Sequence, residues 1–375
     1  MNRRCFSSAL RLYTYIHDHH WNGSAVVGPD PGVRWDRVLF RFVKSVLSFI
    51  PWKDDRYMLQ CQGYWIRDNW LLFDLTSEEQ FKDTAIRATE TVLSQQHPDG
   101  YWSYALPGWR RRIATVEGDY AALGLLASYP RTKDERYLAG ALKWKNFLNS
   151  EIGYSDYQGS ECIHYFAGGG GALVPNNATL TLELLGELYH ATGDTSHLEH
   201  CQEMTGFLKQ VQLESGELPY SVGVESGFGR THFMCYQYNA FQLLDLIHYY
   251  QTTEDNGILD VMKRMAYYLS TGIHRDGHAY YACTKKTPEV IYYSAALGAA
   301  LLESQRIGLG GYGALSNRAY ERVMRFQKQN GGFPYSFRNY GILKDTRSYP
   351  RYLSMILFHL LLRADNRGTK VKSRL

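Results

Sequence analysis

A chain of 375 residues with 45% hydrophobic and 21% charged residues has the balance of a globular protein. Its net charge of +4 is mild and it has no long basic run, so we expect no nucleic-acid partner. No stretch reaches the roughly 18 apolar residues of a membrane span. The N-terminus lacks the apolar core of a signal peptide. Six scattered cysteines without a CxxC pair favour reduced thiols, which predicts a cytoplasmic protein.

A glycine followed four residues later by a tyrosine recurs along the chain. The pairs are Gly100/Tyr104, Gly153/Tyr157, Gly216/Tyr220, Gly277/Tyr281 and Gly331/Tyr335. Their glycines stand 53, 63, 61 and 54 residues apart. A period of this size fits two helices and their connections, so the sequence predicts a repeat architecture.

The segments between these turns alternate between two kinds of predicted helix. The first kind is amphipathic, as in 79–95, where Phe81, Ala85 and Val92 recur near a 3.6-residue period while Lys82 and Glu90 face away. We expect these to be outer, half-solvated helices, at 33–50, 79–95, 134–150, 196–212, 257–271 and 314–329. The second kind is apolar almost throughout, which indicates burial on all sides. We expect these to be inner helices, at 57–74, 116–129, 175–191, 232–251, 288–305 and 349–364.

Prolines support three of the inner helices. Pro175, Pro288 and Pro350 stand where the first helical residue is expected, a position that tolerates proline because its N–H needs no partner. Six outer and six inner helices in alternation predict an all-α (α/α)6 barrel, or toroid, with short hairpin turns. One domain is expected over 1–365. We expect residues 366–375 to form a basic, disordered tail, with at most weak contact to an anionic membrane.

One turn has a family resemblance. The run Gln96-His-Pro-Asp99-Gly100-Tyr-Trp102 resembles the Q-x-x-D-G-x-W turn of the terpenoid cyclase and protein prenyltransferase toroids. The run from Gln329 to Phe333 is a weaker copy, and the run from Gln212 to Gly216 weaker still. The resemblance implies the toroid fold, with Gln96, Asp99 and Trp102 tying the end of an outer helix to the next turn. It supports the fold rather than a reaction.

The catalytic motifs of those relatives are missing. The chain has no D-x-D-D tetrad and no DDxxD run. The segment around Cys235 resembles the zinc-binding region of the prenyltransferases, but Phe233 replaces the aspartate, and an aromatic or apolar residue near Tyr293 replaces the histidine. A lone cysteine cannot hold zinc, which needs three or four ligands. We therefore predict no structural or catalytic zinc and no cofactor.

Polar residues gather at the predicted starts of the inner helices. Since these helices should run parallel, their N-terminal ends converge on one face, where polar groups on otherwise apolar helices indicate a pocket. The candidate catalytic residues are Glu117, Asp119, His232, Tyr236 and Glu289. The candidate substrate-binding residues are Gln62, Tyr64, Arg67, Asn176, Asn177, Tyr238, Asn239, Tyr292, Arg347, Tyr349 and Arg351.

Each candidate also has a structural interpretation. Glu117 and Glu289 could be first-turn acids favoured by the helix dipole, His232 a core histidine, and Arg347 and Arg351 structural partners of the acids. Together, the groups fit a site that processes glycans. A hydrolase would use Glu117 or Asp119 with Glu289 as acid and base. A lyase or epimerase would move a proton with Tyr236 or His232, while Arg347, Asn176 or Asn177 neutralises a carboxylate.

The sequence therefore predicts a carbohydrate-active enzyme that acts on a glycan or glycoconjugate, as hydrolase, lyase or epimerase. The arginines favour an anionic substrate, because a guanidinium binds carboxylate or phosphate bidentately. One alternative is a terpenoid-cyclase-like protein that binds an isoprenoid or its diphosphate. Another is a non-catalytic toroid that serves as a binding module. Stacked tyrosines among hydrogen-bonding groups would favour a sugar, whereas a deep, dry cavity would favour an isoprenoid.

Overall fold

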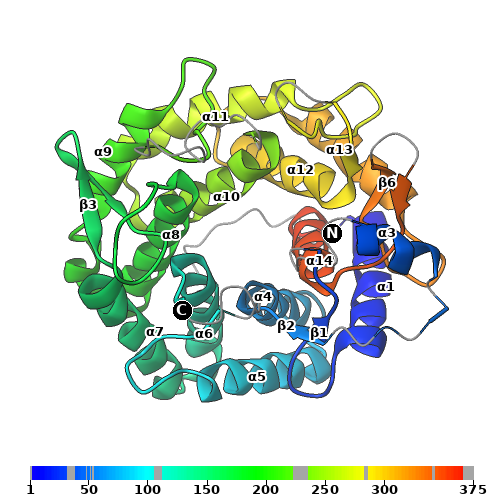
Figure 1. The fold of residues 1–375 in the computed structure, drawn as a ribbon, viewed down its shortest axis with the longest axis horizontal. Coiled ribbons are helices and arrows are strands. Elements are labelled where there is room, and N and C mark those ends of the chain that lie inside the picture. The colour runs from blue at the N-terminus through cyan, green and yellow to red at the C-terminus, as the bar shows by residue number, and fades with distance from the viewer. Residues whose placement is uncertain are drawn as a thin grey trace.

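The computed structural model describes residues 2–31, 39–47, 49–50, 52, 55–104, 112–222, 235–282, 286–339 and 343–365. Within these ranges the chain forms two concentric rings of helices (Figure 1). The inner helices are α4 (Leu59–Thr76), α6 (Thr115–Thr132), α8 (Pro175–Thr192), α10 (Cys235–Thr253), α12 (Ile291–Arg306) and α14 (Pro350–Ala364). The outer helices are α1 (Arg3–His20), α5 (Glu79–Ser94), α7 (Glu135–Phe147), α9 (Cys201–Val211), α11 (Leu259–Thr271) and α13 (Gly313–Arg325).

The inner ring is closed. Each inner helix packs against the next, and α14 returns to pack against α4 and α1. The predicted (α/α)6 toroid is therefore confirmed. The hydrophobic core is one continuous shell between the two rings, which explains why the inner helices are apolar on nearly every side.

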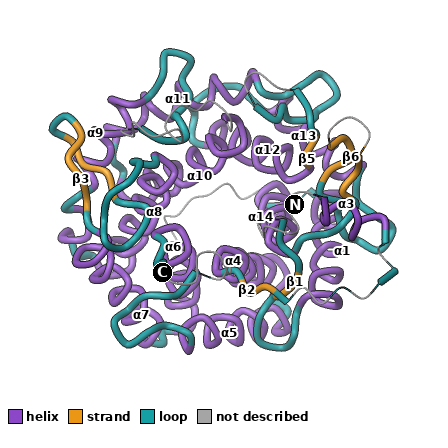
Figure 2. Tube along the Cα trace, in the orientation of Figure 1, coloured by secondary structure: helices purple, strands orange, loops and turns teal. Residues whose placement is uncertain are grey.

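Strands are short and lie at the edges of the rings (Figure 2). Two antiparallel pairs join β1 (Val27–Gly28) to β2 (Arg56–Tyr57), and β3 (Tyr154–Tyr157) to β4 (Ser160–Ile163). A three-stranded sheet has the order β5 (Glu289–Val290), β6 (Ser336–Asn339), β7 (Leu343–Asp345). Short helical turns adjoin α7, α9 and α11, at Leu148–Ile152, Thr195–Leu198 and Asn256–Ile258.

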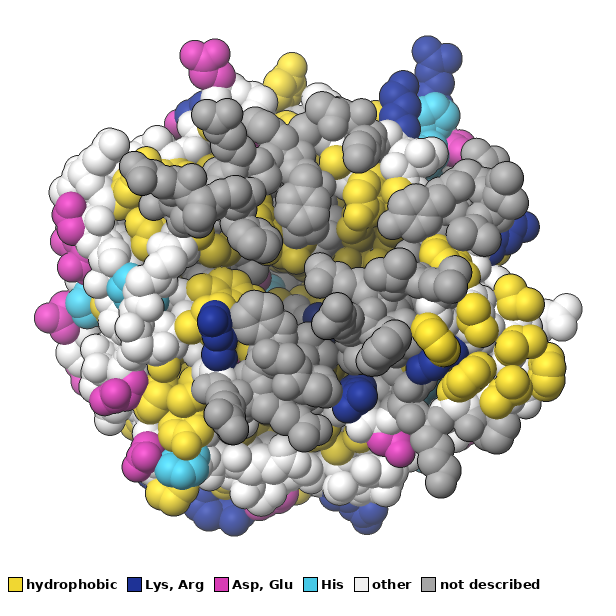
Figure 3. All heavy atoms as spheres, viewed as in Figure 1, with side chains coloured by type: hydrophobic (Ala, Val, Ile, Leu, Met, Phe, Trp, Pro, Cys, Tyr) yellow, Lys and Arg dark blue, Asp and Glu magenta, His cyan; other side chains and the backbone are white. Residues whose placement is uncertain are grey.

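The predicted first outer helix was placed wrongly. The helix outside α14 is α1, whereas 33–50 contains only the short helix α3 (Leu39–Val46) among its described residues. In α1 the buried side chains Cys5, Ala9, Leu12 and Ile16 recur at helical spacing and complete the ring against α14. By contrast, α3 contacts β7 and leaves Phe40 exposed, at a side of the molecule where Figure 3 shows hydrophobic side chains.

The prolines at the first helical position are confirmed for α8 and α14. Pro288 does not begin a helix, because Glu289 and Val290 form β5 before α12 starts at Ile291. No helix within the described ranges is long and apolar enough to cross a membrane. The predicted tail at 366–375 lies outside the described residues, so the domain limit at 365 stays a prediction.

Three of the five repeated turns are joined to the neighbouring helix pair through a glutamine. Gln96 Nε2 donates to the Gly100 carbonyl and to the Gly140 carbonyl on α7, both at 2.8 Å. Gln212 makes the same pair of bonds to Gly216 and Val261, at 2.9 and 3.0 Å. The third copy uses Gln327, which donates to the carbonyls of Gly331 and Ser8. The third copy was expected at Gln329, which is two residues too late.

The Trp102 indole completes the first turn by donating to the Val92 carbonyl on α5 at 2.8 Å. Gln96 and Trp102 therefore tie helix to turn as the resemblance implied. Asp99 differs, because its exposed carboxylate lies 3.2 Å from His97 Nδ1 within the turn itself. The tie is thus made by a side-chain amide and an indole, which need no charge.

Four of the repeated glycines are required by a close approach to the next outer helix. A Cβ on Gly100, Gly216, Gly277 or Gly331 would stand 2.1–2.5 Å from a carbonyl oxygen of that helix, and all four have φ between +91° and +99°. Only glycine adopts this conformation without cost and leaves room for the carbonyl. Gly153 is the exception, since its Cβ would meet nothing within 4 Å.

We expect Gly277→Ala to lower the free energy of unfolding by about 2–6 kcal/mol, because backbone strain and steric overlap add. The new methyl would stand 2.1 Å from the Arg318 carbonyl oxygen. Gly193→Ala is the matched control, because Gly193 also has a positive φ but open space around it. Urea denaturation should show a cost of only about 1–2 kcal/mol for the control. Equal losses for both variants would contradict the role given to close packing.

Candidate functional site

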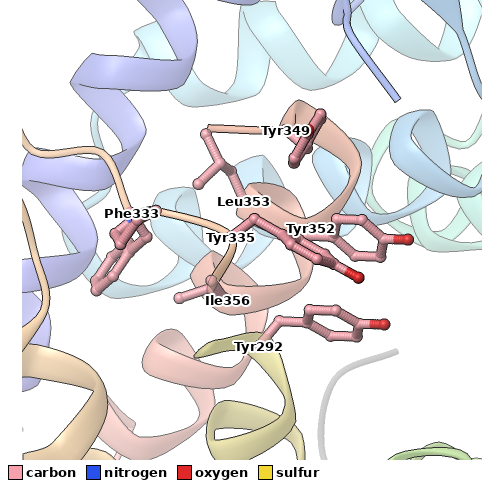
Figure 4. Close-up of a pocket in the computed structure, with 8 residues that line it drawn as sticks. Tyr292, Phe333, Tyr335, Tyr349, Tyr352, Leu353 and Ile356 are labelled. Carbon is pink, nitrogen blue, oxygen red and sulfur yellow. The ribbon is translucent and has the colours of Figure 1, made fainter. Parts of the chain in front are cut away.

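The N-terminal ends of the inner helices carry a group of tyrosines. Tyr292 and Tyr352 stack with ring centroids 4.2 Å apart, and Tyr335 lies 5.4 Å from Tyr352. With Tyr349, Phe333 and other residues they line a small, partly open hollow with about 10 Å³ of free space, room for about one water (Figure 4). The hydroxyl groups of Tyr292, Tyr335 and Tyr352 point toward the same side in this view. Burial raises the pKa of Tyr292, so its hydroxyl stays protonated and can donate a hydrogen bond.

Arg351 stands beside this hollow and is already paired. Its Nε lies 2.6 Å from Asp30 Oδ2, and its Nη2 donates to Asp30 Oδ1 at 2.9 Å and to the Tyr352 hydroxyl at 2.9 Å. The guanidinium also lies over the Tyr352 ring, 4.8 Å from its centroid. Asp30 is 1% exposed, so this is a buried, bidentate ion pair. Arg351 therefore orients Tyr352 and carries no uncompensated charge toward a ligand.

Glu117 is a buried acid that lies close enough to Arg351 and Asp30 for their charges to affect it. Its Oε2 accepts a hydrogen bond from the backbone N–H of Leu59, the first residue of α4, at 3.0 Å. Burial raises the pKa of Glu117 to about 7, although the nearby Arg351 charge lowers it. A carboxyl group that titrates near neutral pH can both give and take a proton, as general acid–base catalysis requires. The same hydrogen bond also makes Glu117 a cap for α4, so the structural role is present as well.

Asp119 contacts residues away from the mouth of the inner ring, our name for the group Tyr292, Tyr335 and Tyr352. Its two oxygens accept hydrogen bonds from Trp144 Nε1 on α7 and Thr181 Oγ1 on α8, both at 2.8 Å. Burial raises its pKa from 3.8 to about 7, and those two hydrogen bonds oppose the shift. Asp119 thus joins an outer helix to an inner one, and the structure does not place it with Glu117.

The raised pKa of Asp119 predicts a pH dependence of stability. Between about pH 4 and pH 7 the folded state holds a proton that the unfolded state releases, so the free energy of unfolding falls as pH rises. The slope from one such group is at most about 1.4 kcal/mol per pH unit. Asp119→Asn should flatten the slope in urea titrations from pH 4 to 8, whereas the exposed Asp83→Asn should leave it unchanged. An unaltered slope in Asp119→Asn would contradict the buried, protonated carboxyl.

A cluster of charged residues lies deeper in the ring, at mid-helix positions. Arg67 Nη2 on α4 donates to Glu183 Oε1 on α8 at 3.0 Å, and His248 Nδ1 on α10 lies 2.8 Å from the same oxygen. Burial by itself would raise the pKa of Glu183, but the charges of Arg67 and His248 outweigh it and lower that pKa to about 2. Burial and the Glu183 charge raise the pKa of Asp245, which accepts a hydrogen bond from Thr179 Oγ1 at 2.9 Å. One ionised and one protonated carboxyl group therefore share this cluster.

An aromatic layer separates the charged cluster from the mouth. Phe241 stacks on Tyr292 at 6.4 Å and on His359 at 6.0 Å, and Tyr64 lies 6.5 Å from His359 and 5.4 Å from Tyr120. His359 is fully buried, and neither of its ring nitrogens has a hydrogen-bond partner among the described residues. Burial and the Arg67 charge lower its pKa to about 3, so the ring is neutral. The inner ring is thus layered, with tyrosines at the mouth, aromatic rings below and charges deepest.

Two other predicted catalytic residues turn toward the outer helices. Both oxygens of Glu289 accept hydrogen bonds from Arg322 on α13 at 2.8 Å, in a bidentate pair. Tyr236 stacks on Tyr268 of α11 at 4.7 Å, and its hydroxyl lies 3.1 Å from Thr271 Oγ1. The structure does not bring these two to Glu117. His232 lies outside the described residues.

The predicted amide ligands have structural contacts of their own. Gln62 exchanges two hydrogen bonds with the backbone of Val26, at 2.7 and 2.9 Å, and Asn239 does the same with Leu218, at 2.7 and 3.1 Å. Such bonds hold a loop against the first turns of an inner helix. Asn177 is buried with neither side-chain atom hydrogen-bonded among the described residues, and its neighbour Asn176 is partly exposed.

Two predicted ligands sit on the approach to α14. The Tyr349 hydroxyl donates to Asp345 Oδ2 at 2.8 Å, and the Arg347 guanidinium lies over the Tyr349 ring, 5.3 Å from its centroid. On α10, Tyr238 packs edge to face with Tyr220 at 5.6 Å. Of the candidates named from sequence, the mouth therefore gathers Tyr292, Tyr349 and Arg351, with Glu117 and Tyr238 beside them. Arg67 and Tyr64 lie deeper.

Sequence reasoning missed six of the residues that define this arrangement. They are Asp30, Glu183, Asp245, His248, Tyr352 and His359. Five of them lie on inner helices, where a charged or polar residue interrupts an apolar run, and that interruption was a usable signal. Asp30 lies in a loop before β2, and nothing in the local sequence marks it as the partner of Arg351.

Comparison with known proteins supports the fold. No protein-family model and no curated protein matches the sequence. Among solved structures, the chain is similar to a cellobiose 2-epimerase from Bacillus thermoamylovorans, with a TM-score of 0.73 and 11% identity over 97% of this chain and 100% of that one. A sugar epimerase from a ruminal bacterium gives 0.72 and 11%, over 96% and 99%. An unsaturated glucuronyl hydrolase from a Bacillus species gives 0.69 and 14%, over 98% of both chains. At these identities the likeness establishes the toroid fold alone.

Proposed function

We propose that the protein is a carbohydrate-active enzyme whose substrate enters at the tyrosine-lined mouth of the inner ring. The observation that carries the proposal is the group Tyr292, Tyr335 and Tyr352 beside Arg351 and the titratable Glu117. Tyrosine rings offer apolar faces to sugar C–H groups and hydroxyls to sugar oxygens. The structural neighbours add support, because the names of several refer to sugars or polysaccharides as substrates.

In this proposal Glu117 is the group that moves a proton. Its Oε2 is held by the α4 backbone, which fixes the carboxyl group, while burial keeps its pKa near neutrality. Hydrolysis needs a second carboxyl group as partner, and epimerisation or elimination needs a base beside a C–H bond. Glu289 and Asp119 are engaged with other helices, and Asp30, the acid whose charge reaches Glu117, is held in an ion pair with Arg351. This favours proton transfer by epimerisation or elimination over two-carboxylate hydrolysis.

The expectation of an anionic substrate is weaker than the sequence suggested. Asp30 neutralises Arg351 and Glu183 neutralises Arg67, so an anionic ligand would have to compete with two buried ion pairs. Arg347, the third predicted arginine, lies over the Tyr349 ring. The isoprenoid alternative would need a dry cavity below the mouth. In the described interior the aromatic layer lies below the mouth and the buried charged cluster lies beneath that layer, and such charged groups favour a polar ligand.

A binding experiment tests the mouth directly. Neutral and uronate-containing oligosaccharides should bind the wild type, and Tyr352→Ala should weaken binding about two- to tenfold through loss of ring contacts. Tyr267→Ala is the matched control, because Tyr267 is an exposed tyrosine on α11. Isothermal calorimetry with the same sugars on all three proteins measures the effect. Equal affinity in wild type and Tyr352→Ala, for every sugar that binds, would show that the sugar does not bind at the mouth.

A further inference from the structure

The turn between α11 and the start of β5 carries two histidines and an aspartate that face one another. His274 Nδ1 lies 2.9 Å and His278 Nδ1 lies 2.7 Å from the same oxygen, Oδ1 of Asp276. These three potential ligand atoms all lie within 4.8 Å of one another. The side chains are 41%, 16% and 42% exposed for His274, His278 and Asp276, so an ion can reach them from solvent.

The turn is held in place by its backbone. His274 N donates to the His278 carbonyl at 2.9 Å, and Gly277 N donates to the His274 carbonyl at 2.9 Å. Gly277 packs closely against the Arg318 carbonyl of α13. Ala279 N donates a hydrogen bond to Ser294 Oγ on α12 at 2.9 Å. The three side chains therefore stand on a scaffold that is fixed to both an outer and an inner helix. Such a scaffold reduces the entropy lost when the ligands are ordered around an ion.

We propose that His274, Asp276 and His278 bind a late first-row divalent cation, with Zn²⁺ as the best fit. Two imidazoles and one carboxylate suit zinc, and water can complete a tetrahedral set. In a tetrahedral set, zinc–nitrogen bonds of about 2.0–2.1 Å place the two Nδ1 atoms about 3.4 Å apart, so the side chains, whose ligand atoms lie within 4.8 Å of one another, must rotate inward around the ion. The sequence predicted no structural or catalytic zinc anywhere in the chain, because the ligands expected around Cys235 are missing, and the present proposal departs from that prediction.

Arg322 does not oppose this site. Its Nη1 lies 3.4 Å from Asp276 Oδ2, the oxygen that the histidines do not face, and its other nitrogens are paired with Glu289. The guanidinium therefore orients the carboxylate from behind, as partners of metal ligands commonly do. The Glu289 charge compensates the arginine next to a bound cation.

The chain contains a natural comparison for this site. The turn at His97 has the same His-x-Asp-Gly pattern, with His97 Nδ1 3.2 Å from Asp99 Oδ2. Tyr101 stands where His278 stands in the other turn, and it stacks on His97 at 4.3 Å. The first turn thus offers two ligands and the second offers three. Since each lost ligand weakens a metal site, we expect zinc at the second turn only.

Calorimetric titration of Zn²⁺ into the metal-free full chain tests the proposal. The wild type should bind one ion, and His278→Tyr, which copies the first turn, should bind it at least about tenfold more weakly. His97→Asn should leave the affinity unchanged, and His274→Asn should reproduce the loss if His278→Tyr folds poorly. Zinc should also raise Tm in the wild type but not in His278→Tyr, because an ion that binds only to the folded state stabilises that state. Binding that is equally tight in wild type, His278→Tyr and His274→Asn would overturn the assignment, as would no binding by the wild type.

Discussion

Arg67→Met should lower the free energy of unfolding by about 3–5 kcal/mol, the typical cost of removing one partner of a buried ion pair. Methionine keeps much of the packing on Phe358, whose ring lies 4.7 Å from the Arg67 guanidinium carbon. It leaves Glu183 ionised and 3% exposed, with His248 as its remaining partner. Urea denaturation of both proteins at pH 7 measures the loss.

Two further variants separate a buried charge from a general packing defect. Arg67→Met combined with Glu183→Gln should recover part of the stability, because no unpaired carboxylate remains. Arg136→Met removes an arginine from exposed pairs with Glu90 and Asp134, and it should cost far less stability than Arg67→Met because exposed pairs are screened by solvent. If Arg67→Met is as stable as Arg136→Met, the deep cluster contributes nothing to the fold.

Glu117→Gln should lower kcat/KM on a turned-over glycan by about 10²- to 10⁴-fold, the usual contribution of a positioned acid or base. The amide oxygen can still accept the hydrogen bond from Leu59 N, so the free energy of unfolding should change by less than about 1 kcal/mol. The wild-type pH–rate profile should bend near pH 7, where Glu117 titrates. That bend should be missing from the variant.

The control for this variant is Glu135→Gln, an exposed acid in the first turn of α7. It should leave both kcat/KM and the pH profile unchanged. Full activity of Glu117→Gln with an unaltered bend would show that Glu117 only caps α4. Loss of activity together with loss of folding would likewise support the capping role over the catalytic one.

Most of the fold could be predicted because each helix carries its own periodic signal. The positions of α5, α6 and α8 follow from local spacing of apolar residues and need no knowledge of tertiary contacts. The first outer helix was assigned to 33–50 instead of α1. The correct choice depends on which segment packs against α14 and closes the ring, and this long-range contact does not appear in the local spacing of apolar residues. The glutamine of the last repeated turn was expected at Gln329 rather than Gln327 for a similar reason. The hydrogen bond that identifies Gln327 goes to the Ser8 carbonyl, near the opposite end of the chain.

The candidate site could be predicted only in part. Parallel inner helices place their starts together, which is why Tyr292, Tyr349, Arg351 and Glu117 were found from helix position alone. Position along a helix does not give the direction of a side chain around it. Glu289 and Asp119 therefore counted as pocket residues, although their partners lie on α13 and α7.

Nuclear magnetic resonance of a panel of neutral and uronate-containing sugars, incubated with wild type and with Glu117→Gln, tests the central claim most directly. We expect new anomeric or C–H exchange signals from at least one sugar with the wild type, and about 10²-fold or greater loss of that signal with Glu117→Gln. Turnover that is unchanged by Glu117→Gln, or binding of an isoprenoid diphosphate with no binding or turnover of any sugar in the panel, would contradict it.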